Sequence, residues 1–142
     1  MTNFPLEIVT PDRMFFSGEV ESVIVRGVDG DLAVLKNRAP LVTPLKIGKV
    51  RIRIDGKEKV AALCSGYIIV SKEKTTIISD SAEWPEEIDI KRAEEAKKRA
   101  EKRLKEKPSE IDTKRAKLAL RRALNRLDVA KMKNIDSTKN IE

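Results

Sequence analysis

The sequence predicts a mainly β N-terminal domain followed by an α-helical hairpin, and three observations lead to this fold class. Short runs of β-branched and apolar residues, separated by turns, fill residues 1–84. From Pro85 onward, apolar residues recur at helical spacing among many Lys, Arg and Glu residues. Pro108 divides this second half. We therefore expect a β domain at 1–84, a two-helix hairpin at 85–133, and a frayed, non-periodic tail at 134–142.

Seven segments of the first half have the composition and length of β-strands. They run over residues 5–9, 20–25, 31–35, 50–54, 60–64, 67–70 and 75–78. Val50-Arg51-Ile52-Arg53-Ile54 alternates strictly between apolar and charged residues, which predicts a sheet with one solvated face. Asp29-Gly30 and Asp55-Gly56 lie between strands and suit tight hairpin turns. Many short strands at this spacing indicate a β-sandwich or a barrel.

The second half carries start and stop signals for two helices. Pro85, two glutamates and Asp89 predict a helix from Ile88 to about Glu106. Pro108 ends it, and Ser109 can cap the next helix. The apolar stripes consist of Ala93, Ala96, Ala100 and Leu104 in the first helix and Ala116, Ala119, Leu120, Ala123, Leu124, Leu127 and Ala130 in the second. Alanine buries little area, so at about 25 cal/mol per Å² we expect this hairpin to be marginally stable on its own.

The formal net charge of +7 is concentrated in the second half. Residues 1–84 hold 12 basic and 11 acidic side chains, whereas residues 85–142 hold 18 and 12. Within 113–133, eight basic residues accompany a single acid, Asp128, a pattern that suits an acidic partner. The chain has no histidine and one cysteine, so the usual zinc and iron ligands and the commonest general base are missing. We expect no metal requirement.

Other features exclude whole classes of protein. No apolar run approaches the ~20 residues of a membrane span, and no apolar leader precedes the first strand. A lone cysteine excludes an internal disulfide and fits a reducing compartment, so we expect a soluble, cytoplasmic protein. The chain shows neither a βαβ rhythm nor a glycine-rich phosphate loop, which excludes Rossmann and Walker-type nucleotide sites.

Two antiparallel helices would nevertheless bring Asp89, Arg92, Arg99, Arg122 and Arg126 toward one groove. Arg92 and Arg99 are seven residues apart and Arg122 and Arg126 four apart, so each pair shares a helix face. Guanidinium forks suit phosphate groups, which makes this groove a candidate nucleotide site. The alternative is that Asp89 is only an N-cap and that Arg92 is solvated.

Six motifs occur in an order that resembles the epsilon subunits of bacterial F-type ATP synthases. They are Val9-Thr10-Pro11-Asp12, Gly30-Asp31-Leu32-Ala33-Val34-Leu35, Ala39-Pro40-Leu41-Val42-Thr43-Pro44-Leu45, Ser65-Gly66-Tyr67, Ile88-Asp89-Ile90-Lys91-Arg92-Ala93, and Arg115-Ala116-Lys117-Leu118-Ala119-Leu120-Arg121-Arg122-Ala123-Leu124-Asn125-Arg126-Leu127. Each is modest alone, but their order over a β half and a helical half is specific, and the resemblance covers nearly the whole chain.

The resemblance implies a ten-stranded β-sandwich that binds the gamma subunit and rests on the c-ring. It also implies a hairpin that folds back, or extends along gamma to the alpha and beta subunits and inhibits ATP hydrolysis. ATP, as a regulatory ligand, would favour the folded form. The chain would then be a non-catalytic rotor subunit that helps to couple proton or sodium ion flow to ATP synthesis. It would lie peripherally at the cytoplasmic face of the bacterial plasma membrane.

The same resemblance implies three sets of site residues. The ATP-binding set is Glu83, Ile88, Asp89, Arg92, Ala93, Arg99, Arg122 and Arg126. The inhibitory contact, toward an acidic loop of the beta subunits, is Lys114, Arg115, Lys117, Arg121 and Arg122. The rotor contact is Asp31, Asn37 and Arg38. The alternatives are a solvated helix face for the inhibitory set and plain hairpin turns for the rotor set.

A second class of function is a basic nucleic-acid-binding module, which the charged tail and high isoelectric point suggest. That tail lacks the interleaved aromatic residues that stack on bases. A free-standing enzyme is the poorest fit, since the sequence offers no nucleophile motif and no metal cluster.

Overall fold

The computed structural model describes residues 3–132. The chain divides into two compact units, Met1–Glu83 and Trp84–Glu142, and each is described by itself. The predicted frayed tail at 134–142 lies outside the described residues. The first unit is a β-sandwich and the second an α-helical hairpin, so the predicted fold class is confirmed.

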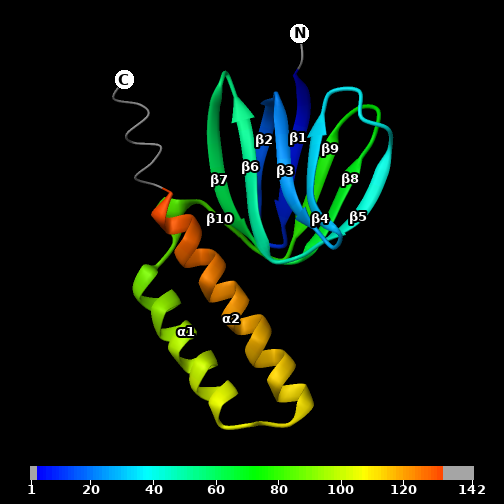
Figure 1. Ribbon diagram of the computed structural model, residues 1–142. Helices are drawn as coiled ribbons and strands as arrows, with labels where there is room; N and C mark the ends of the chain where they lie inside the picture. The colour runs from blue at the N-terminus through cyan, green and yellow to red at the C-terminus, as the bar shows by residue number, and fades with distance from the viewer. Residues whose placement is uncertain (1–2, 133–142) are drawn as a thin grey trace. The chain divides into compact units, whose positions relative to one another are not determined.

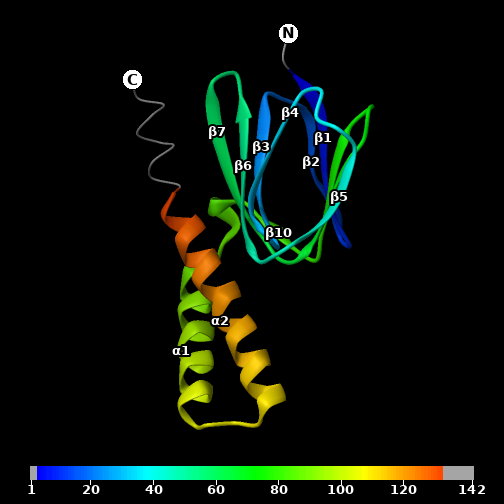
Figure 2. The ribbon, with the colours of Figure 1, turned by 45° about the vertical axis from the view of Figure 1, so that its right-hand side comes forward.

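Ten strands build the first unit (Figure 1). They are β1 (Phe4–Thr10), β2 (Arg13–Val20), β3 (Ser22–Gly27), β4 (Gly30–Leu35), β5 (Leu41–Leu45), β6 (Gly48–Ile54), β7 (Lys57–Leu63), β8 (Gly66–Val70), β9 (Thr75–Ser79) and β10 (Ala82–Glu83). Hydrogen bonds link them in the order β10-β7-β6-β3-β5-β8-β9-β1-β2, and β4 pairs with β3. The sheet curls on itself, so opposing strands enclose the core in both views (Figures 1 and 2).

The core of the sandwich is aliphatic. Leu6, Ile8, Ile52, Ile68 and Ile77 are fully buried and come from four different strands. In β6 the predicted alternation is confirmed, because Val50 and Ile52 are buried whereas Arg51 and Arg53 are exposed. Burial of each such side chain stabilises the fold by about 1.5–3 kcal/mol.

One of the two predicted hairpin turns is confirmed and the other is shifted by a residue. Asp55 and Gly56 connect the paired residues Ile54 and Lys57 with φ of 50° and 75°, as a tight primed turn requires. In the other hairpin Gly27 pairs with Gly30, so the loop is Val28-Asp29 and Gly30 opens β4 with φ 120°. Glycine is needed there because residues with a side chain rarely adopt a backbone φ of this value.

The pattern of apolar runs in the sequence did not predict three of the strands. β2 carries few apolar residues in alternation, β5 contains Pro44, and β10 has only two residues. The predicted strand over 20–25 corresponds to β3 but begins two residues too early, since Glu21 separates β2 from β3. These segments are strands because neighbouring strands pair with them. β2, for example, pairs with β1 after a turn in which the Thr10 hydroxyl donates to Asp12 Oδ1 at 2.6 Å. That hydrogen bond holds the pKa of Asp12 below its usual value.

The helical unit contains a 3₁₀ turn, η1 (Pro85–Glu87), and the helices α1 (Ile90–Lys105) and α2 (Glu110–Lys131). The predicted start at Ile88 is wrong by two residues, because Pro85 opens η1 and Ile88 is extended. Asp89 Oδ1 caps α1 by accepting from the Arg92 amide at 3.1 Å. The Ser109 hydroxyl caps α2 by accepting from the Asp112 amide at 3.3 Å, as predicted.

Alanines form the seam between the two antiparallel helices, which run side by side in Figures 1 and 2. Its buried members repeat every seven residues, at Ala93 and Ala100 in α1 and at Ala116, Ala123 and Ala130 in α2. The predicted stripe of α2 is wrong in two details. Leu124 is 44% exposed, and the fully buried Val129 was not included. Neither helix of the described residues is long and apolar enough to cross a bilayer.

Candidate functional site

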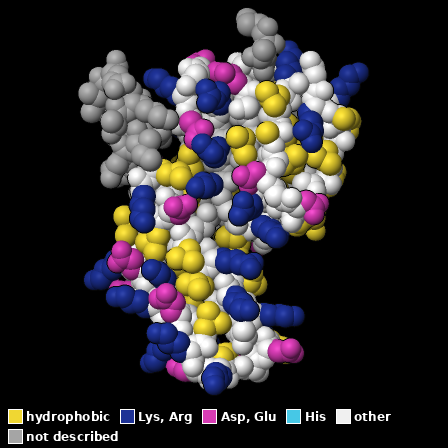
Figure 3. Space-filling view, in the orientation of Figure 1, with side chains coloured by type: hydrophobic (Ala, Val, Ile, Leu, Met, Phe, Trp, Pro, Cys, Tyr) yellow, Lys and Arg dark blue, Asp and Glu magenta, His cyan; other side chains and the backbone are white. Residues whose placement is uncertain are grey.

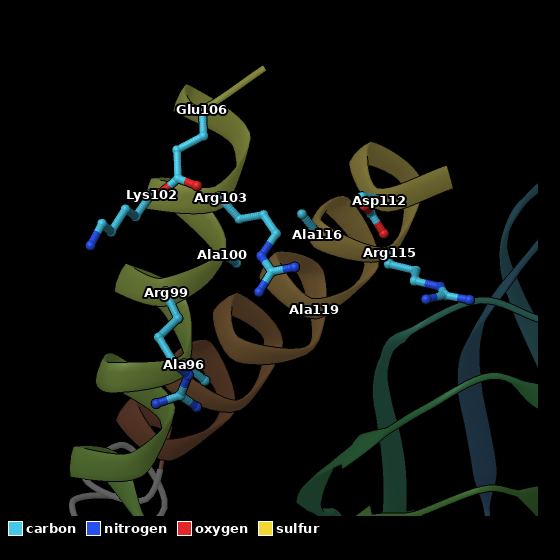
Figure 4. Close-up of a pocket in the computed structure, with 10 residues that line it drawn as sticks. All are labelled: Ala96, Arg99, Ala100, Lys102, Arg103, Glu106, Asp112, Arg115, Ala116 and Ala119. Carbon is cyan, nitrogen blue, oxygen red and sulfur yellow. The ribbon is translucent and has the colours of Figure 1, made fainter. Parts of the chain in front are cut away.

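A cavity of about 480 Å³ opens between α1 and α2, toward the loop that joins them. Alanines of the seam line its floor, and in Figure 4 the Arg103 side chain extends across it, whereas Lys102 and Arg115 point away from the facing helix. Its lining residues are Ala96, Arg99, Ala100, Lys102, Arg103 and Glu106 from α1 and its C-cap, and Asp112, Arg115, Ala116 and Ala119 from α2. We call this the hairpin groove.

Three arginines give the hairpin groove its positive character. Arg99 and Arg103 project from α1, and the Arg103 guanidinium extends toward Ala119 of α2 (Figure 4). Arg115 belongs to the α2 wall. Within residues 3–132 no ion pair is recorded for these three side chains. The lining contains four basic side chains, Arg99, Lys102, Arg103 and Arg115, against the two acids Glu106 and Asp112, so the groove favours an anion.

Helical periodicity continues this arginine wall toward the open end of the hairpin. Arg92 lies seven residues before Arg99, and Arg122 lies seven residues after Arg115. Residues seven apart lie on nearly the same side of a helix, two turns along. Arg126 is one turn beyond Arg122, half-buried, and makes interactions of its own. The predicted arginines therefore share the groove side of their helices, although only Arg99 of that set lines the cavity itself.

The residues at the start of α1 have structural roles. The Asp89 carboxylate is exposed and acts as the N-cap of α1, as the cap signals in the sequence predicted. A carboxylate has two oxygens, and capping uses Oδ1, which leaves Oδ2 as an acceptor for a ligand amino group. Ile88 and Ala93 are 7% and 4% exposed and belong to the packed interior of the hairpin.

Glu83, the remaining member of the predicted ATP set, belongs to the sandwich unit. It lies in β10, is half-buried and pairs with Ala62 of β7.

Two arginines of the groove, Arg103 and Arg115, were not predicted as ligand-binding residues. Their signal was present in the sequence, since Arg103 is one turn after Arg99 and Arg115 is two turns before Arg122.

The predicted inhibitory set is exposed throughout. Its members are Lys114, Arg115, Lys117, Arg121 and Arg122, all on α2. Arg115 lies at the groove, whereas Lys114 and Lys117 are about 100–200° around the helix from the groove-lining Ala119. Exposure makes these side chains accessible to a partner subunit. A helix face that contacts only solvent, which is the alternative interpretation, is exposed in the same way.

The predicted rotor contacts lie on and just after β4, which pairs with β3 alone. Asp31 is held by an ion pair with Arg26 at 3.2 Å. Arg38 folds back so that its guanidinium donates to the Ala33 carbonyl at 3.2 Å, and Asn37 has φ 68° in the connecting turn. The three predicted residues thus surround one exposed edge strand.

A second feature of the sandwich is an apolar row across its outer face. The register pairs Pro44 with Tyr67, Tyr67 with Ile78, Ile78 with Val9, and Val9 with Met14. Met14, Tyr67 and Ile78 are 52%, 53% and 46% exposed. Contiguous exposed apolar side chains indicate an interaction surface.

Two family models cover the described chain. The model of the ATP synthase Delta/Epsilon chain beta-sandwich domain matches residues 3–85, and the model of the long alpha-helix domain matches residues 86–131. The chain belongs to this ATP synthase family. The resemblance inferred from the six motifs is thereby confirmed.

Individual relatives agree with this assignment. The chain is 54% identical to the ATP synthase epsilon chain of Alkaliphilus metalliredigens over 93% of its own length and 98% of the relative's. It is 50% identical to that of Brevibacillus brevis over 92% and 100%. A chain in the cryo-EM structure of the Euglena gracilis mitochondrial ATP synthase, comprising OSCP, F1 and c-ring, superposes with a TM-score of 0.74 at 21% identity, over 84% of this chain and 76% of that one. The last match shows the shared fold. None of these comparisons supports the nucleic-acid-binding alternative.

The described residues contain no group of three or more potential metal ligands among His, Cys, Asp and Glu.

Proposed function

We propose that the chain is a non-catalytic regulatory subunit of the central stalk of a rotary ATP synthase, and that its hairpin senses ATP. One observation carries the proposal: arginines of both helices line one side of a hairpin whose seam is built mainly from alanine. A polyphosphate in the hairpin groove would bind guanidiniums from α1 and α2 together. It would add a ligand-dependent link between two helices that otherwise hold each other weakly.

The free energy of ATP binding is large enough to switch the hairpin between its closed and extended forms. The buried members of the seam are alanines apart from Val129, so each contact contributes far less than a leucine contact. A ligand at 100 times its dissociation constant stabilises the closed hairpin by about 2.7 kcal/mol. Ligand binding and arginine repulsion are then of the same order as the packing, so nucleotide concentration decides which form dominates. ATP is bound in this scheme and is not hydrolysed.

Release of the hairpin would free two helices of 16 and 22 residues. At about 1.5 Å per residue they are roughly 24 and 33 Å long, and end to end they reach about 57 Å from the sandwich. Pro108 prevents one unbroken helix, so a bend is expected where the helices meet. In this extended form the basic face of α2 would contact the acidic surface of the alpha and beta subunits and inhibit ATP hydrolysis.

The sandwich would supply the permanent attachment. The apolar row of Val9, Met14, Pro44, Tyr67 and Ile78 suits the gamma subunit, because burying it removes apolar surface from water. The exposed edge strand β4, with Asp31, Asn37 and Arg38, would face the c-ring. These contacts would place the chain peripherally at the cytoplasmic face of the bacterial plasma membrane.

ATP titration of the isolated chain by calorimetry tests the sensing site. The double variant Arg122→Ala/Arg126→Ala should bind ATP at least about tenfold more weakly, since each hydrogen bond to a charged group contributes about 1.5–3 kcal/mol. The matched control is Lys114→Ala/Lys117→Ala, which removes the same charge from the other side of α2 and should leave the affinity within about twofold. Equal binding by wild type and the arginine variant would refute the site.

Removal of α2 tests the inhibitory role. A chain that ends after Lys107 keeps the whole sandwich and should still copurify with the assembled complex. ATP hydrolysis by that complex should rise relative to the complex with the full chain, most clearly at low ATP. Unchanged hydrolysis with intact assembly would count against inhibition by the hairpin.

A further inference from the structure

The loop between α1 and α2 is short. α1 ends at Lys105 and α2 begins at Glu110, so the chain reverses its direction within residues 106–109. Loops of about two to five residues connect antiparallel helices in a few defined conformations. The backbone conformation of each loop residue therefore decides whether the two helices can lie side by side.

Lys107 holds this loop in a left-handed backbone conformation, with φ 52°. Within residues 3–132 the other non-glycine residues with a positive φ are Asn37 and Asp55. Asparagine and aspartate adopt this conformation more readily than other residues with a Cβ atom, because their short polar side chains can hydrogen-bond locally. Lysine has no such compensation, and helices that end with a left-handed residue usually place glycine there. The backbone of Lys107 is therefore strained.

Pro108 opposes the conformation of Lys107 in a second way. The proline ring favours an extended backbone, with a negative φ, at the residue that precedes it. The Lys107 side chain is exposed, so it contributes little burial that could offset this cost. Strain of this kind shifts a conformational equilibrium by roughly fivefold or more.

Hydrogen bonds fix the part of the loop that follows Lys107. The Thr113 amide donates to the Ser109 carbonyl at 2.8 Å, and the Thr113 hydroxyl donates to the Pro108 carbonyl at 3.4 Å. Together with the Ser109 cap, these bonds join Pro108 and Ser109 to the first turn of α2. This side of the loop must therefore move together with α2.

The part of the loop before Lys107 is joined to α1 in the same manner. The Glu106 amide donates to the Arg103 carbonyl at 3.3 Å, and the Lys107 amide donates to the Leu104 carbonyl at 3.4 Å. Both amides precede the N–Cα bond of Lys107, about which φ rotates. Rotation about that bond therefore keeps the hydrogen bonds on either side of it, and only the seam between the helices resists it.

We propose that Lys107 is a strained hinge that favours opening of the hairpin. A change from its positive φ to the negative φ of an extended residue relieves the strain and turns α2 away from α1. The seam of small side chains, and an anion bound to both helices, oppose this change. The inference rests on the proposed function for its regulatory meaning: the strain at Lys107 raises the ATP concentration that keeps the hairpin closed.

Amide hydrogen exchange of the full chain without nucleotide tests the hinge, under conditions where the exchange rate follows the opening equilibrium. Isolated helices of this length are marginally stable in water, so the amides of α1 and α2 exchange from the open hairpin. Lys107→Gly and Lys107→Asn introduce residues that tolerate a positive φ, and both should slow this exchange by about threefold to fivefold. Exchange in the sandwich should be unchanged and is the internal reference.

Two further substitutions at the same position separate strain from charge. Lys107→Gln removes the charge but keeps a long side chain with a Cβ atom, so exchange should stay within about twofold of wild type. Lys107→Val places a β-branched residue at a positive φ, where such residues are least tolerated, and should accelerate exchange by about fivefold.

Slower exchange in Lys107→Gly and Lys107→Asn, but not in Lys107→Gln, supports the hinge. Equal slowing in Lys107→Gln assigns the effect to the lost charge and overturns it. Unchanged or faster exchange in both Lys107→Gly and Lys107→Asn also overturns it, because relief of the strain would then not stabilise the closed form.

ATP calorimetry of the same proteins separates this inference from the proposed function. Absence of ATP binding in the wild type and in every variant would refute the sensing site. The exchange measured without nucleotide would still decide whether Lys107 is a strained hinge.

Discussion

The sandwich and the hairpin of this chain are held together in opposite ways. The sandwich closes around fully buried Leu and Ile side chains and joins its strands by continuous hydrogen-bonded pairing. The hairpin relies on five alanines at seven-residue spacing within each helix, together with Val129, and arginines lie beside this seam. In the space-filling view, apolar side chains along the hairpin alternate with Lys, Arg, Asp and Glu (Figure 3). The difference suits a fixed attachment in the first unit and a switch in the second.

The largest expected effect concerns the core of the sandwich. Ile68→Ala removes a fully buried side chain from β8 and should lower the free energy of unfolding by about 2–5 kcal/mol. Ile78→Ala on the neighbouring strand β9 is the control, because Ile78 is 46% exposed, and it should cost less than about 1 kcal/mol. Urea denaturation followed by far-ultraviolet circular dichroism in the β-sheet region measures both. Similar losses would mean that the sandwich does not depend on its enclosed core.

An intermediate effect is expected at the alanine seam. Ala123→Leu inserts a large side chain where the helices approach closely and should destabilise the closed hairpin by about 1–3 kcal/mol. Amide hydrogen exchange should accelerate in α1 and α2 and stay unchanged in the sandwich. Ala119→Leu, at a half-buried position of the same helix, should have a smaller effect. A seam that tolerates leucine at 123 would not be the weak point of the molecule.

The smallest expected effect separates the two roles of Asp89. Asp89→Ser retains an N-cap oxygen, so the helicity should remain near that of wild type, whereas Asp89→Ala should cost about 1 kcal/mol. The serine side chain is too short to reach a ligand amino group, so ATP should bind more weakly to both variants. Full ATP affinity in Asp89→Ser would leave capping as the whole role of this carboxylate.

Much of the fold was determined by local sequence. Periodicity predicted the strict alternation of β6 and the alanine seam. Residue types predicted the turn at Asp55-Gly56 and the caps Asp89 and Ser109. These features depend on a few neighbouring residues, whose dihedral preferences and hydrogen bonds operate over one turn or one hairpin. The glycine of the family motif Ser65-Gly66-Tyr67 has a reason that is not local, because a side chain at 66 would overlap the Ile78 carbonyl of the paired strand β9.

Other features were decided only by the tertiary structure. β2, β5 and β10 are strands because partners supply their hydrogen bonds, and Leu124 is exposed because of how the helices are rotated about the seam. The same applies to function: the arginine spacing was visible in the sequence, but the position of the groove, with Arg103 and Arg115 in its walls, depends on the pairing of α1 with α2. A cavity between the β4–β5 connection and the β8–β9 turn likewise joins residues more than 30 positions apart. The conformational preferences of single residues do not predict such contacts, because burial and the distance between charges depend on the assembled fold.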